Sequence, residues 1–225
     1  MKACVDFRRF AKPLLCLVAL VGAQWPALAQ TEIPGYPDTI MAYDPREIAL
    51  LPRYCAYTQS FRERVPGGNN QKVIDEWYAQ LGQPFHAMHH YCWGLMKTNR
   101  ALFLARGQQA RRFYLADSLN EFDYVITRVP DDFILLPEIL AKKGENLILL
   151  GRGQVGVFEL ERAIQLKPDY WPPYAYISDY HKSTGDLTKA REILERGLVQ
   201  SPDAKGLLRR VDELKQPNDK KKAKP

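Results

Sequence analysis

The sequence contains a repeated unit of 34 residues between Pro137 and Pro202, and this repeat limits the possible folds more than any other feature. When the two copies are aligned, small residues, leucines and prolines fall on equivalent positions. The equivalent pairs are Gly144/Ser178, Gly151/Gly185, Leu160/Leu194, Ala163/Gly197, Ile164/Leu198 and Pro168/Pro202. Both copies are therefore expected to form the same local structure.

Each copy is expected to form two antiparallel helices. Small residues such as Gly144 and Gly197 suit a close helix crossing, where a larger side chain would hold the backbones apart. Gly151 and Gly185 are placed to turn the chain between the helices. A proline then ends the second helix, because it cannot donate the backbone hydrogen bond that a continuing helix needs.

This spacing resembles the tetratricopeptide repeat, which has a bulky residue and Leu-Gly in its first helix and Ala, Phe or Tyr, Ala and Pro in its second. The first copy carries this pattern in part, with Gly156 where alanine is usual, at Leu140, Gly144, Leu147, Gly151, Leu160, Ala163 and Pro168. The second copy carries it more fully, at Tyr174, Ile177, Ser178, His181, Gly185, Ala190, Leu194, Gly197 and Pro202. The resemblance implies partner binding rather than catalysis.

The rest of the chain also predicts helices, so the expected fold is all-α. It is a short α-solenoid of tetratricopeptide-like hairpins (131–214) with a helical N-terminal part (44–130). The expected segments are a short helix from Asp44-Pro45, then 53–65, 71–81, a long helix from Pro84 to about Arg106, 108–129, and a capping helix at 203–214. Helices 84–106 and 108–129 resemble a degenerate repeat hairpin. Residues 66–70, Pro-Gly-Gly-Asn-Asn, are expected to form a loop.

The N-terminal end of the sequence predicts export. Residues 1–29 read as a signal peptide, with a basic start, an apolar run too short to span a bilayer, and a cleavage site after Ala29. Acylation of Cys16 is disfavoured by the large residue before it, so a periplasmic or secreted protein without a membrane anchor is expected. Residues 30–43 predict an extended leader and 215–225 a disordered basic tail. Cys55–Gly68 and His86–Arg100 also resemble the N-terminal part of exported bacterial repeat proteins, which implies no activity.

Removal of the signal leaves Cys55 and Cys92 as the only cysteines. In an oxidising compartment two cysteines favour one disulfide, and two buried thiols are the alternative. The signal peptide contributes +3 and residues 215–225 contribute +4 to the net charge of +6, so residues 30–214 carry a charge of −1. The positive net charge of the whole sequence therefore gives no reason to expect a nucleic-acid partner.

Three histidines, His86, His89 and His90, share one face of the expected long helix. Such spacing suits zinc, but no glutamate lies between them as a base, and Lys97 and Arg100 on the same face would repel a cation. No metal or other cofactor is predicted.

That face predicts an anion site more readily. From Trp77 to Ala116 every charged residue is positive, namely Lys97, Arg100, Arg106, Arg111 and Arg112. Arginines beside aromatic rings suit carboxylates, phosphates or anionic glycans. The candidate anion face is His86, His89, His90, Trp93, Lys97 and Arg100. The alternative is a basic helix face packed against acidic residues such as Glu121, Asp123, Asp131 or Asp132.

The resemblance to tetratricopeptide repeats implies a groove along the first helix of each unit. The implied groove residues are Glu138, Ala141, Glu145 and Ile148 from one unit, and Ala175, Tyr176, Asp179 and Lys182 from the next. Small residues leave room for a peptide, and mixed charges can fix its register. The alternative is that the two units only pack on their own flanking helices.

The sequence lacks the usual motifs of nucleophilic, phosphate-binding and zinc-dependent catalysis. The expected function is therefore an exported adaptor or scaffold that binds a protein or peptide, not an enzyme. A ligand-binding or metal-dependent module on the face of His86, His89, His90 and Arg100 is the second hypothesis.

Overall fold

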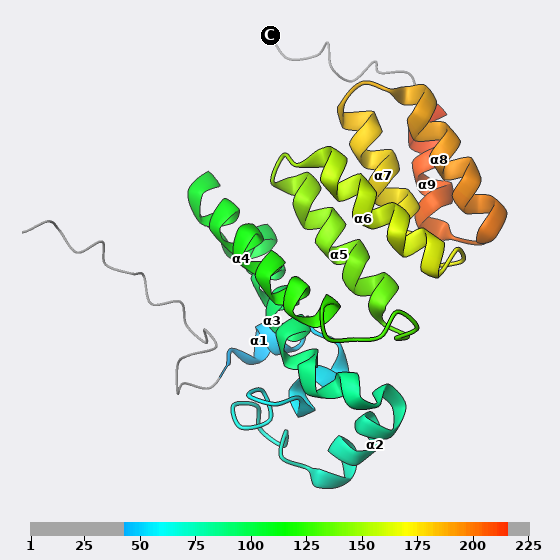
Figure 1. The fold of residues 1–225 in the computed structure, drawn as a ribbon. Coiled ribbons are helices and arrows are strands. Elements are labelled where there is room, and N and C mark those ends of the chain that lie inside the picture. Colours follow the sequence, from blue (N-terminus) through cyan, green and yellow to red (C-terminus); the bar gives the residue numbers. More distant parts are fainter. Residues whose placement is uncertain (1–42, 216–225) are drawn as a thin grey trace, which may run out of the picture. The chain divides into compact units, whose positions relative to one another are not determined.

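The computed structural model describes residues 43–215, and every regular element among them is a helix, as expected (Figure 1). The expected signal peptide, and the leader and tail except for Tyr43 and Lys215, lie outside the described residues. The α-helices are α1 (Pro45–Ile48), α2 (Gln71–Leu81), α3 (Met88–Asn99), α4 (Gln108–Ile126), α5 (Leu136–Leu149), α6 (Gly153–Leu166), α7 (Pro172–Ser183), α8 (Leu187–Gln200) and α9 (Lys205–Lys215). Shorter elements are the 3₁₀ helices η1 (Arg53–Tyr57) and η2 (Gln83–Ala87) and the π-helical turn η3 (Arg100–Leu104).

Helix α1 begins at a side chain that caps it. The Asp44 carboxylate accepts a hydrogen bond from the Arg46 backbone N–H at 2.8 Å, and Pro45 occupies the first helical position. The expected helical segment 53–65 is wrong beyond Tyr57. Ser60 adopts a φ of 66°, a left-handed conformation that a continuing helix cannot contain. The chain then passes through turns to α2.

The disulfide joins this N-terminal segment to α3. Cys55 in η1 is bonded to Cys92 in α3, with their Cα atoms 5.7 Å apart, which confirms the pairing expected from the cysteine count. Both cysteines are buried in the hydrophobic core. Met88, Tyr91 and Met96 of α3 lie in the same core.

The expected single helix from Pro84 to about Arg106 is wrong, because η2, α3 and η3 divide it. In η3 the Ala105 N–H donates to the Arg100 carbonyl at 2.8 Å, five residues back. A π turn changes the register of a helix. Leu102 and Phe103, which a regular helix would place on or beside the core face, are instead 39% and 68% exposed.

The two copies of the 34-residue unit form α5–α6 and α7–α8. The backbones of α5 and α6 cross so closely that a Cβ on Gly144 would lie 2.8 Å from the Gly156 carbonyl oxygen. A Cβ on Gly156 would lie 2.6 Å from the Gly144 oxygen, which explains why glycine replaces the usual alanine there. Gly151 and Gly185 turn the chain at φ values of 83° and 89°, a region that favours glycine.

The repeat helices join the N-terminal helices through a buried amide. Asn146 on α5 donates to the hydroxyls of Thr98 on α3 at 2.6 Å and Ser118 on α4 at 2.7 Å. All three side chains are buried.

The last helix, α9, packs on α7 and α8 and buries Leu207. Within residues 43–215, the structure has no helix with an apolar stretch long enough to cross a bilayer.

Candidate functional site

Polar side chains on α3, α5, α7 and α9 are connected from one helix to the next, and we call them the polar ladder. Its members are Tyr91, Glu138, Lys142, Glu145, Tyr176, Asp179, Lys182, Arg210 and Glu213. Helices α5 and α7 are the first helices of the two 34-residue units. Helix α9 lies where the first helix of a third unit would lie. The ladder therefore follows the direction in which the units succeed one another.

The ladder begins where α3 meets α5. The Tyr91 hydroxyl donates to a Glu138 carboxylate oxygen at 2.6 Å. Burial raises the pKa of Tyr91 well above its usual value, and the negative charge of Glu138 adds to the effect. Tyr91 thus stays protonated at neutral pH and holds the half-buried Glu138 in one position.

The centre of the ladder connects α5 with α7 through Lys142. Its ammonium donates to the Glu145 carboxylate at 3.0 Å and to the Tyr176 hydroxyl at 3.1 Å. The same ammonium lies 5.6 Å from the centre of the Tyr176 ring. Burial lowers the pKa of Lys142, but the charge of Glu145 and the contact with Tyr176 outweigh it and raise the pKa overall. Lys142 is therefore positive at every physiological pH.

The far end of the ladder connects α7 with α9. The Arg210 guanidinium donates to both carboxylate oxygens of Asp179, at 2.7 to 3.0 Å. Lys182 pairs with Glu213 at 3.2 Å, although this pair is more exposed. These contacts fix the positions of the Asp179 and Lys182 side chains on α7.

The structure separates the expected groove residues into two groups. Ala141 and Ala175 are fully buried and cannot line a groove, because they pack under the helices. The charged and aromatic members are accessible, with Glu138, Glu145, Tyr176 and Asp179 half-buried and Lys182 exposed. Ile148 is half-buried and contacts the core. The accessible members of this set are therefore polar and aromatic rather than small.

Sequence reasoning missed four ladder residues, and the repeat register could have found three of them, Lys142, Arg210 and Glu213. Lys142 and Tyr176 are 34 residues apart, and 34 residues further lies Arg210. Glu145, Asp179 and Glu213 form a second series with the same spacing. Extension of the repeat by one more helix would have assigned α9 to it. Tyr91 carried no such signal, since its spacing placed it in the core.

The candidate anion face is packed against carboxylates of the same chain. Lys97 is 2% exposed and pairs with Asp117 at 2.7 Å and Glu121 at 2.5 Å, both on α4. Arg100, also 2% exposed, donates to both oxygens of Glu47 on α1, at 2.6 and 2.8 Å. Both cations are therefore buried between α3 and the helices that supply these carboxylates. The geometry favours the alternative of a basic face packed against acidic residues, of which Glu121 was one expected member.

His90 and Trp93 of the candidate anion face also have partners within the chain. His90 Nδ1 lies 2.5 Å from Glu121, and the His90 ring stacks on Tyr124 with ring centres 3.5 Å apart. The Trp93 indole N–H donates to the Tyr43 hydroxyl at 3.0 Å. Burial raises the pKa of Glu121, but hydrogen bonds from His90 and Lys97 outweigh it and lower the pKa overall. This network ties α3 to α4.

His86 and His89 line a surface hollow of about 500 Å³. Its lining residues are Gln59, Gln83, Pro84, His86, Ala87, His89, Tyr124, Arg128 and Pro130, without a carboxylate. Burial lowers the pKa of His89 to about 4, and the nearby His90 adds to the effect, so His89 is neutral at pH 7. Between residues 43 and 215, no three His, Cys, Asp or Glu side chains are placed to hold a metal ion.

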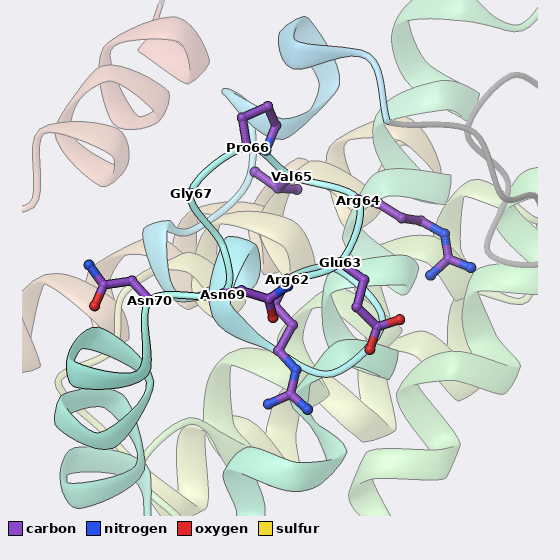
Figure 2. A pocket seen from close by; sticks show the side chains of 8 residues that line it. All are labelled: Arg62, Glu63, Arg64, Val65, Pro66, Gly67, Asn69 and Asn70. Carbon is purple, nitrogen blue, oxygen red and sulfur yellow. The ribbon is translucent and has the colours of Figure 1, made fainter.

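A second hollow, of about 690 Å³, belongs to the loop before α2. Figure 2 shows that Arg64 and Asn70 point to opposite sides, and that Arg62 and Glu63 point away from the loop. A Cβ on Gly68 would lie 2.5 Å from the Ala56 carbonyl oxygen, so the loop is held by backbone packing. The expected turn is present, and its side chains do not converge on a ligand.

No protein-family model matches the sequence, and a search of curated proteins finds no significant match. Function must therefore be argued from the geometry of this chain.

Proposed function

We propose that this chain is an exported adaptor that binds a protein or peptide partner along the polar ladder. In this proposal α5–α6 and α7–α8 are tetratricopeptide-like units of a short α-solenoid, and α9 takes the place of the first helix of a third unit. The partner lies across α5 and α7, next to Lys142, Glu145 and Tyr176.

The observation that carries the proposal is the repetition of the ladder at the period of the repeat. Lys142, Tyr176 and Arg210 form one series and Glu145, Asp179 and Glu213 the other. Lys142 pairs with Glu145 and Arg210 with Asp179 between the series, and Lys142 also donates to Tyr176 within the first series. Such a wall offers alternating donors and acceptors to an extended peptide backbone. Tyrosine and arginine are also the residues that contribute most often to binding energy at protein interfaces.

Export is supported by the disulfide between Cys55 and Cys92. Structural disulfides persist in oxidising compartments and are rare in the cytosol. The signal-like residues 1–29 favour the same location. A periplasmic or secreted adaptor is the simplest function that unites these features with the ladder.

A pull-down from the cell envelope tests the proposal with two ladder variants, Tyr176→Ala and Lys182→Glu. Tyr176→Phe separates the hydroxyl from the ring, since only its hydrogen bond with Lys142 is lost. The matched controls are Arg191→Glu and Val199→Ser, which lie exposed on α8. We expect the ladder variants to lose a partner that the wild type and both controls retain. Unchanged partners in folded Tyr176→Ala and Lys182→Glu would remove the ladder as the binding surface.

A further inference from the structure

The turn between α3 and α4 presents apolar side chains to solvent. Leu102 is 39% exposed, Phe103 68% and Leu104 60%, and these three residues are consecutive. Phe113, one helical turn into α4, is 54% exposed. We call Leu102, Phe103, Leu104, Arg106, Arg112 and Phe113 the α3–α4 tip. Isolated exposed apolar residues are common, but a group of this kind marks an interaction surface.

The backbone explains why these side chains face outward. Arg100 is fixed by Glu47, and the π turn that follows changes the register of the helix after this anchor. Three consecutive residues of a helix point in different directions, so a helix packed on a neighbour cannot expose all of them. Gly107 then reverses the chain with a φ of 91°, and a Cβ there would meet no atom within 4 Å. The end of this helical pair therefore stands in open space.

The charge at the tip has one sign. Arg106 and Arg112 are exposed, and Arg111 between them is half-buried. No acidic residue occurs from Trp77 to Ala116. The first carboxylate that follows, Asp117, already pairs with Lys97. Among residues 43–215 neither Arg106 nor Arg112 has a carboxylate partner, so the tip is both apolar and positive.

We propose that the α3–α4 tip docks on a bilayer surface that contains anionic phospholipid. Phe103 and Leu104 enter the boundary between headgroups and acyl chains, while Arg106 and Arg112 contact lipid phosphates. Interfacial binding depends on two contributions, the burial of apolar side chains and the attraction of cationic side chains to anionic lipid. The tip has side chains of both kinds. An acidic protein surface would suit the arginines, but three consecutive apolar residues at a free helix end fit a fluid interface better. The contact is peripheral and is separate from the polar ladder.

Vesicle sedimentation tests this inference with the intact mature protein. Vesicles of phosphatidylglycerol and phosphatidylcholine are compared with vesicles of phosphatidylcholine alone. We expect binding to the anionic vesicles only, and a loss with salt because the charges are exposed. The double variant Phe103→Ser/Leu104→Ser should bind at least about tenfold more weakly, since two large apolar side chains are removed. Arg106→Glu/Arg112→Glu should also reduce binding by about tenfold or more.

The matched control is Phe158→Ser on α6, where a phenylalanine is 63% exposed. It should bind vesicles as the wild type does, and thermal melts should show that all three variants remain folded. Two results overturn the inference: no sedimentation with anionic vesicles, or equal sedimentation of the tip and control variants. If the wild type does not bind vesicles, and the tip variants no longer retain a protein that the wild type retains in the pull-down, the tip is a protein-docking surface instead.

Discussion

Gly156→Ala offers a sharp test of how the two repeat helices pack. Alanine is the usual residue at this position in the tetratricopeptide pattern and forms helices better than glycine by about 0.5–1 kcal/mol. Here, however, its Cβ would lie 2.6 Å from the Gly144 carbonyl oxygen and 2.7 Å from Ile148 Cγ1. The oxygen belongs to backbone, so α5 and α6 would have to move apart.

The free-energy cost of this close contact should exceed the gain from the higher helix propensity of alanine. Overpacking of a close contact costs about 1–3 kcal/mol, and here it also weakens the neighbouring Leu160 contact with Gly144. We expect a net destabilisation of about 1–2 kcal/mol, which corresponds to a fall in Tm of roughly 2–8 °C for a chain of this size.

Equilibrium unfolding in urea, monitored by helical circular dichroism, measures this change. Val155→Ala on the same helix is the control, because Val155 is 45% exposed and its truncation should change stability by less than about 0.5 kcal/mol. A Gly156→Ala protein as stable as the wild type, or more stable, would refute the close crossing of α5 and α6.

Three other predictions follow from the contacts in the core. Replacement of Cys55 and Cys92 by serine should cost roughly 3–4 kcal/mol, because the disulfide closes a loop between residues 37 apart. Free thiols at both Cys55 and Cys92 in the unreduced protein would contradict the bond. Asn146→Ala leaves the Thr98 and Ser118 hydroxyls without their donor and should lower the free energy of unfolding by about 1–3 kcal/mol. The control Asn120→Ala, at an exposed position, should change it little. Equal effects of the two substitutions would refute the role of the amide. The pKa of His89 falls from 6.5 to about 4 on folding, so the unfolded state binds the proton more readily and stability should decline as the pH falls from about 6.5 towards 4. His89→Gln should flatten this part of the urea-unfolding profile while Gln59→Ala in the same hollow should not, and an unchanged slope in His89→Gln would count against the buried neutral imidazole.

The helices of the two repeats were predictable because their signals are local. Gly151, Gly185, Pro168 and Pro202 decide turns and helix ends within a few residues, and the structure has helices between them. Pairing of Cys55 with Cys92 was predictable by elimination once the signal was set aside. In contrast, helical spacing alone reveals neither the π turn that begins at Arg100 nor the contact of Arg100 with the distant carboxylate of Glu47.

The surface residues were harder to predict than the helices. A helical wheel separates an apolar face from a polar face but does not show which polar face meets another helix. Lys97 looked solvent-exposed by this criterion, yet α4 covers it with Asp117 and Glu121. Conversely, Ala141 and Ala175 looked accessible by analogy and are buried. Burial of this kind depends on the crossing of helices, which is a tertiary property.

Residue-specific photocrosslinking tests the central claim, that the polar ladder binds the partner, most directly. A benzophenone-bearing amino acid replaces Tyr176 on α7 in one protein and Val199 on α8, which is 76% exposed, in another. After illumination in the cell envelope, we predict a discrete adduct from position 176 and none from position 199. An adduct of equal yield from position 199, or none from position 176, would contradict the assignment of the ladder as the binding surface.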